Sequence, residues 1–440
     1  MNLIYGIKDK PKFSQMLVFA FQQVLAILAA TIVVPVIVGN GMSQSAALFG
    51  AGIGTLVYQL LTKFRSPVFL GSSFAFIPSM TAAFAGAASA SAGFAGIILG
   101  AALAGLVYVI IATVVKLVGV NWINKLMPAV VIGPTVALIG LSLAGAAIKD
   151  VFSYGPQDAN GSFIMTAPIW ASLVCALVTL LVVVTVSTYG KKMLKLIPFI
   201  VGILAGYVVA AIFTVCGIPV IDFSVFQNVQ IFAVPEFTFL EAIKGVKDID
   251  GAFIATVVVA YVPVAFVVFA EHIADHKNLS SIIGEDLLEN PGLHRTLLGD
   301  GIGSVAGAIF GGCPNTTYGE SVGCVAITRN ASVVTITTAA IMCIVISFFG
   351  PFVAFLDSIP GCVMGGVCVT LYGFIAVSGL KMIQKVDLNQ NKNLFVVATI
   401  LIPGIGGMAM AIGKVTLTAV ACSLVLGIIT NVLLSKGSEE

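Results

Sequence analysis

Eleven apolar runs, each long enough to cross a lipid bilayer, dominate this sequence. They begin near residues 16, 43, 91, 127, 166, 196, 251, 332, 361, 393 and 415, and a bilayer core needs about 20 apolar residues per helix. Of the residues, 59% are hydrophobic and only 9% are charged, whereas roughly a quarter are charged in an ordinary soluble domain. The chain is therefore predicted to be an all-α polytopic membrane protein.

Three further stretches, at 67–83, 296–311 and 314–327, are shorter or are broken by glycine and polar residues. Together with the long runs they predict about 14 transmembrane segments. The segment 218–243 ends in Pro235, Glu236 and Glu241 and is too polar to span, so we expect it on the outer surface. The first apolar run is too long for a cleavable signal peptide.

The positive charges predict the orientation of the spans. If the N-terminus is cytoplasmic, only Lys149, Lys244, Lys247 and Lys414 of the 21 Lys and Arg residues fall in outer loops. Cytoplasmic loops of membrane proteins carry an excess of Lys and Arg. The distribution therefore favours this orientation, with both termini inside. No basic run is long enough to indicate nucleic-acid binding.

The third and tenth spans share an unusual pattern. Residues 67–79 and 313–323 each open with a short extended stretch carrying Gly, Ser or Thr and then turn helical. Two halves of seven spans would enter the membrane from opposite sides, which is the inverted-repeat plan of secondary transporters, whose broken segments meet near the midplane. We expect two short antiparallel strands there, with free N–H groups of the following helix N-termini facing a ligand.

Two acidic residues, Glu271 and Glu320, fall within membrane segments, whereas most others lie in loops or tails. A carboxyl group at membrane depth is costly and marks a functional candidate, and burial favours its protonated form. The alternatives are a carboxylate that staples the broken turn for Glu320 and an interfacial residue for Glu271. Asp275 lies one turn after Glu271 on the same face, as either a proton relay or a solvated helix-end acid.

Other candidates carry weaker signals. Phe74 follows Gly71, Ser72 and Ser73, which leave room for its ring to stack on a planar heterocycle; ordinary packing is the alternative. His272 and His276 are spaced like metal ligands, but no third ligand is evident, so no metal is expected. The eight cysteines lack a CxxC pair and are read as apolar packing residues. No catalytic motif is present, so an enzyme is not expected.

Several motifs, in order along nearly the whole chain, resemble the nucleobase–ascorbate transporter family in its bacterial uracil permease branch. They are residues 315–320 (Asn-Thr-Thr-Tyr-Gly-Glu), 71–76 (Gly-Ser-Ser-Phe-Ala-Phe), 270–273 (Ala-Glu-His-Ile), 291–295 (Pro-Gly-Leu-His-Arg) and 326–329 (Ala-Ile-Thr-Arg). The resemblance implies 14 spans in two inverted seven-span repeats. It also implies a multi-pass protein of the bacterial plasma membrane that commonly forms homodimers.

The resemblance further implies two domains that hold the substrate between them. The core comprises 1–120 (spans 1–4) and 251–357 (spans 8–11). The gate comprises 121–217 (spans 5–7) and 358–440 (spans 12–14 with a cytoplasmic tail), and 218–250 is an extracellular connector.

Position by position, the family's substrate-binding residues fall on Phe74, Glu271, Gly319 and Glu320. Gly319 would offer its backbone N–H to a substrate carbonyl. Three positions depart from the family pattern: Gln23 replaces a His common in span 1, Asp275 replaces a His found in some relatives, and Ser321 replaces a common Asn.

The predicted function is uracil import by proton symport, with alternating access between core and gate. Uracil is neutral, so its uptake against a gradient needs a coupled ion. We expect H⁺ carried by Glu271 and Asp275, and no cofactor. The alternatives are a purine or xanthine symporter on the same scaffold, or an anion exchanger or channel, which two buried acids disfavour.

Overall fold

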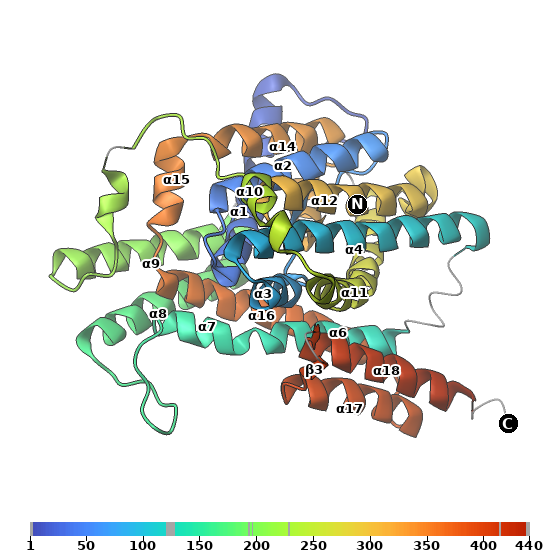
Figure 1. Ribbon diagram of the computed structural model, residues 1–440. Coiled ribbons are helices and arrows are strands. Elements are labelled where there is room, and N and C mark those ends of the chain that lie inside the picture. Colours follow the sequence, from blue (N-terminus) through green and yellow to red (C-terminus); the bar gives the residue numbers. More distant parts are fainter. Residues whose placement is uncertain are drawn as a thin grey trace.

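The computed structural model describes residues 3–119, 128–191, 194–195, 197–227, 229–412 and 415–436. Lys125, Lys192 and Lys414, the predicted boundary between residues 120 and 121, and the predicted tail after residue 436 lie outside the described residues. The protein is mostly helical, and its helices pack in two groups (Figure 1).

The first group contains both broken segments and lies in the upper part of Figure 1. Here α2 packs on α12 and α14, and α4 packs on α11 and α12. Its elements are α1 (Phe13–Val38), α2 (Gln44–Leu61), β1 (Leu70–Ser72), α3 (Ile77–Gly86), α4 (Ala90–Val118), α11 (Gly251–Ile283), α12 (Leu293–Gly311), β2 (Asn315–Thr317), α13 (Gly319–Thr328) and α14 (Val333–Ser347).

Most of the second group lies below it in Figure 1, with α9 at mid-height on the left, and α16 packs on α6, α7 and α8. Its elements are α6 (Ala129–Ser142), α7 (Ala144–Val151), α8 (Ala167–Tyr189), α9 (Pro198–Val215), α16 (Gly361–Ile383), α17 (Asn391–Ile405), β3 (Met410–Ile412), β4 (Val415–Leu417) and α18 (Ala419–Lys436). The antiparallel hairpin β3–β4, which contacts α11, was not foreseen from the sequence.

Short elements connect the groups: η2 (Phe223–Phe226), α10 (Thr238–Gly245), η3 (Val246–Asp248) and α15 (Gly350–Asp357). A further short element, η4 (Leu288–Gly292), joins α11 to α12 within the first group. The elements within 218–243 are too short to span a bilayer, since a helix rises only about 1.5 Å per residue. Instead, α10 packs against α4.

Seven helices in the described residues are long and apolar enough to cross a membrane, and α14, α17 and α18 are shorter apolar helices. The polytopic all-α class with short antiparallel strands is thus confirmed, while the number 14 stays a prediction.

Local signals set several helix ends. Ser43 and Ser89 accept the N–H of Ala46 and Ala92, as N-caps do, and Gly312 ends α12 with a φ of +71°, a conformation that glycine adopts at little cost.

Candidate functional site

Strands β1 and β2 pair in the interior of the first group, as the two broken segments predicted. The pairing is antiparallel, with Leu70 opposite Thr317, Gly71 opposite Thr316 and Ser72 opposite Asn315. Helix α3 begins at Ile77 and α13 at Gly319, so both helices start next to the strand pair. Their first N–H groups lack intrahelical partners.

The tyrosine between β2 and α13 locks the strand pair. The Tyr318 ring lies directly against Gly71, where a Cβ would come within 2.4 Å of the ring carbon Cε2. Its hydroxyl donates to the Ser72 carbonyl at 2.7 Å. On the other side, the backbone N–H of Leu70 donates to Thr55 Oγ1 at 2.9 Å. The strands are therefore tied both to each other and to α2.

The Asn315 side chain holds β2 in place between α2 and α12. A Cβ on Gly54 of α2 or Gly307 of α12 would come within 2.4 Å of the Asn315 side chain, so only glycine leaves room there. The Asn315 amide donates to the Gly50 carbonyl at 2.8 Å, and Ser304 donates to the Asn315 carbonyl. These contacts fix the position from which Gly319 and Glu320 project.

A cavity of about 450 Å³ lies between the two helix groups. We call its two sides the polar wall and the apolar wall. The polar wall comes from the first group: Phe74, Ala75, Val267, Ala270, Glu271, Ala274, Asp275, Thr316, Thr317, Tyr318, Gly319 and Glu320. The apolar wall comes from the second group: Ile132, Val136, Ile139, Phe199, Leu371, Phe374, Ile375, Ser378 and Met382.

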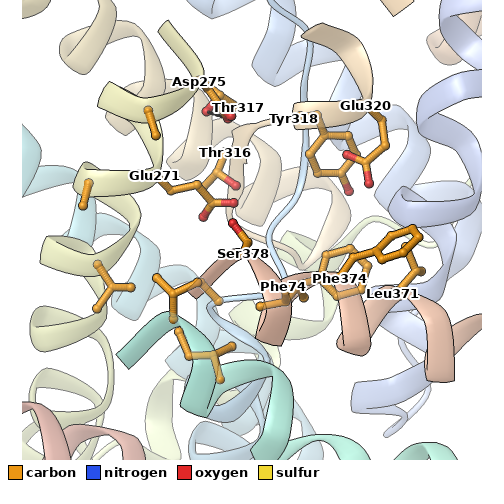
Figure 2. Close-up of a pocket in the computed structure, with 18 of the residues that line it drawn as sticks. Phe74, Glu271, Asp275, Thr316, Thr317, Tyr318, Glu320, Leu371, Phe374 and Ser378 are labelled. Carbon is orange, nitrogen blue, oxygen red and sulfur yellow. Dashed lines mark hydrogen bonds between the residues drawn. The ribbon is translucent and has the colours of Figure 1, made fainter. Parts of the chain in front are cut away.

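The structure brings all five predicted site residues, Phe74, Glu271, Asp275, Gly319 and Glu320, to this one cavity (Figure 2). Glu271 is exposed to it, and Asp275 and Glu320 are half-buried. Thr317 donates to Asp275 Oδ2 at 2.7 Å, so this carboxyl is tied to β2 and is not a freely solvated helix end. The described lining contains three carboxyl groups and no Lys or Arg.

Phe74 connects the two walls. Its ring lines the cavity and meets the ring of Tyr372, on α16, edge to face at a centroid distance of 6.5 Å. Figure 2 shows Phe74 beneath the acidic residues, beside Leu371 and Phe374. A flat ligand that enters the cavity can therefore lie on an aromatic face while its edges reach the carboxyl groups.

The face of α11 that points away from the cavity carries a polar network that sequence reasoning missed. His272 Nδ1 lies 2.9 Å from Asp300 Oδ2, and the His272 and His276 rings stack at 4.0 Å. His276 Nε2 lies 2.7 Å from the Tyr58 hydroxyl. Asp300 is fully buried in α12, which corrects the prediction that only Glu271 and Glu320 are acids within membrane segments. Its position inside the predicted stretch 296–311 was the signal that could have found it. Among the described residues, no three metal-ligating side chains cluster.

Two of the three departures from the family pattern contact each other. The Gln23 side chain on α1 donates to Ser321 Oγ on α13, and Ser321 Oγ also accepts the backbone N–H of Phe69 at 3.2 Å. All three residues are buried. The pair thus joins α1 to the helix that begins with Gly319 and Glu320.

Comparison with known proteins gives one family. Residues 14–413 match the model of the Permease family. The uracil permease of Bacillus caldolyticus is 39% identical over 434 residues, which cover 98% of this chain and 94% of that protein. The uracil permease of Escherichia coli K12 is 33% identical over 426 residues, which cover 96% of this chain and 92% of that protein. These relatives are permeases, which are transporters and not enzymes.

Solved structures share the fold at low sequence identity. Murine Slc26a9, an anion transporter in the inward-facing state, superposes with a TM-score of 0.67 at 13% identity and covers 98% of this chain and 69% of its own. The transmembrane domain of the cyanobacterial bicarbonate transporter BicA gives a TM-score of 0.61 at 15% identity. The superposition covers 97% of this chain and 100% of that domain. At such identities the likeness concerns the fold alone.

Proposed function

The chain belongs to the Permease family, and from this premise we propose that it imports uracil by proton symport. The family and the apolar helices make it a multi-pass membrane transporter. The observation that carries the substrate proposal is the polar wall, where carboxyl groups, the first N–H of α13 and an aromatic ring face one cavity.

Uracil matches these groups one by one. Its flat ring has two N–H donors and two carbonyl acceptors. Glu271 and Glu320 would accept from the N–H groups, the backbone N–H of Gly319 would donate to a carbonyl, and Phe74 would stack on the ring face. Gly319 is exposed and lines the cavity, and as the first residue of α13 its N–H has no partner within the helix.

The charges in the cavity support proton coupling. Glu271, Asp275 and Glu320 share a cavity whose described lining offers no cationic side chain. Carboxyl groups can bind a proton and release it again, as coupling requires. We propose that Glu271 and Asp275 carry the coupled H⁺, while Glu320 fixes the ring. The proton gradient would then drive uptake, and no cofactor would be needed.

Motion of one helix group against the other would expose the cavity to each side of the membrane in turn. We propose the first group, with 1–120 and 251–357, as the core and the second, with 121–217 and 358–440, as the gate, joined by 218–250. Both termini would lie in the cytoplasm of a bacterium, and the protein would form a homodimer.

Counterflow of labelled uracil in proteoliposomes tests the proposal, with pH and sodium gradients imposed separately. We expect counterflow without any gradient, and accumulation only when the outside is acidic. Uptake that follows sodium, or that ignores a collapsed proton gradient, contradicts the coupling. Unlabelled xanthine should compete poorly; strong competition favours the purine alternative.

Anion exchange is the second candidate because the solved structures with this fold include transporters of anions. The cavity argues against it. Three carboxyl groups with no Lys or Arg in the described lining would repel an anion. Chloride or bicarbonate exchange in the same proteoliposomes would overturn this argument.

A further inference from the structure

The apolar wall contains one polar side chain. Leu371, Phe374, Ile375, Ser378 and Met382 line the cavity from α16. Leu371 is followed three and four residues later by Phe374 and Ile375, then by Ser378 and Met382 one and two turns on, so the five form a single stripe along one helix face. Ser378 is the only hydroxyl in this stripe, and the described residues of α6 and α9 add only Ile132, Val136, Ile139 and Phe199 to the wall.

The hydroxyl of Ser378 is free to bind a ligand. Ser and Thr in membrane helices often donate to a carbonyl one turn earlier; on the same helix, Thr370 donates to the Val367 carbonyl at 2.7 Å. Ser378 has no hydrogen-bond partner among the described residues and is exposed to the cavity. Figure 2 shows its hydroxyl oxygen pointing into the cavity on the side of Glu271.

The usual structural role of a small residue in a membrane helix, close packing, belongs to the neighbouring position. A Cβ on Gly379 would come within 2.2 Å of the Ala137 backbone on α6, and one on Gly140 of α6 within 2.5 Å of the Tyr372 carbonyl. The backbones of α6 and α16 therefore touch at these glycines. This contact fixes the helix that carries Ser378, while Ser378 itself points away from the contact.

The polar wall leaves part of a pyrimidine ring unsatisfied. Under the proposed function, on which this inference rests, two carboxyl groups accept from the two N–H groups and Gly319 donates to one carbonyl. The second carbonyl then needs a donor, and an ionised carboxylate cannot provide one; a protonated Glu271 can donate, but only while it holds the coupled proton. A hydroxyl can, and on the opposite wall Ser378 provides it.

We propose that the Ser378 hydroxyl donates a hydrogen bond to the substrate carbonyl that Gly319 leaves free. Ser378 thereby determines specificity from the second helix group. It selects a ring with a carbonyl at that edge, and it gives the otherwise apolar wall a polar contact with the substrate.

The test is equilibrium binding of labelled uracil to the purified, full-length protein and to Ser378→Ala, Ser378→Thr and Thr370→Val. One neutral hydrogen bond corresponds to about threefold to tenfold in affinity, so Ser378→Ala should weaken binding by that factor. Ser378→Thr, which keeps the hydroxyl, should restore it. Thr370→Val removes a hydroxyl that faces away from the cavity and should bind like the unsubstituted protein.

Competition by 2-thiouracil and 4-thiouracil locates the contact, because sulfur is a weaker hydrogen-bond acceptor than oxygen. One of the two analogues should lose its sensitivity to Ser378→Ala, while the other keeps the full effect. Unchanged uracil affinity in Ser378→Ala, or equal weakening for uracil and both analogues, overturns the proposal.

Binding by the unsubstituted protein separates this proposal from the proposed function. If that protein does not bind uracil, the substrate assignment fails. If it binds uracil and Ser378→Ala binds equally well, the Ser378 contact alone fails.

Discussion

The two broken segments share one architecture and differ in chemistry. Each has a buried three-residue strand followed by a ten-residue helix, β1 with α3 and β2 with α13. The first contributes only Phe74 and Ala75 to the cavity, whereas the second contributes every residue from Thr316 to Glu320. Pro occupies the first turn of α3, and Glu320 occupies the first turn of α13.

This difference shows how two segments of the same architecture can line one cavity asymmetrically. Pairing of β1 with β2 needs both segments and places the N-termini of α3 and α13 together. Under the proposed function, recognition would divide between the two segments: the first offers a ring face and the second offers donors and acceptors. Substitutions in the two segments should therefore impair different properties of the protein, such as its uracil affinity, its thermal stability or its proton-driven uptake.

The largest effect is expected from Glu320→Gln in the second segment. An amide lacks the charge that strengthens acceptance from a ring N–H, and hydrogen bonds to charged groups contribute about 1.5–3 kcal/mol. Uracil affinity should fall roughly 10- to 100-fold, measured by equilibrium binding. Glu285→Gln, at an exposed position outside the cavity, is the matched control. Equal affinity in the two variants would show that Glu320 only staples its turn.

Much of this segment could be predicted from sequence because its residues conflict with a lipid environment. Glu320 in an apolar chain, and Gly or Thr where a helix should continue, mark a functional break without any structure. Pairing of β1 with β2 followed from the same reasoning. The motif resemblance supplied the family, which the comparisons confirm.

The apolar wall and the back face of α11 could not be predicted in this way. Helix α16 is apolar on every side, so no periodicity shows which stripe faces the cavity, and Ser378 resembles any small residue in a membrane helix. Asp300 and His272 are partners only because α12 packs on α11, a contact between distant parts of the sequence. The hairpin β3–β4 straddles the predicted outer loop that carries Lys414, and its strands read as the ends of the two flanking apolar runs.

The strand of the first segment should tolerate less change in volume than the helix of the second. In Gly71→Ala the added Cβ would lie 2.4 Å from the Tyr318 ring, and overpacking of this kind costs about 1–3 kcal/mol. In Gly323→Ala, on α13, no atom lies within 4 Å of the added Cβ. Thermal unfolding of the detergent-solubilised protein should show a lower transition temperature for Gly71→Ala alone. A similar loss in both variants would mean that Tyr318 can shift.

Phe74→Leu in the first segment should weaken uracil binding about threefold to tenfold, because an aromatic pair contributes about 0.5–1.5 kcal/mol beyond its buried area. Equilibrium binding measures it, with Phe84→Leu as control, since Phe84 lies on α3 away from the cavity. Unlike Glu320→Gln, this change removes no hydrogen bond. Unchanged binding would assign Phe74 to packing against Tyr372.

The smallest effect is expected from a substitution of Thr317 in β2, which lies opposite Leu70 of β1. Thr317 donates to Asp275, while its partner in β1, Leu70, has no hydroxyl. Thr317→Val removes one ordinary hydrogen bond and should lower proton-driven uptake about threefold, while counterflow without a gradient stays close to normal. Thr317→Ser keeps the hydroxyl and should retain both activities. Equal losses in uptake and counterflow would place Asp275 in substrate binding and not in proton coupling, because counterflow needs the binding site but no net proton movement.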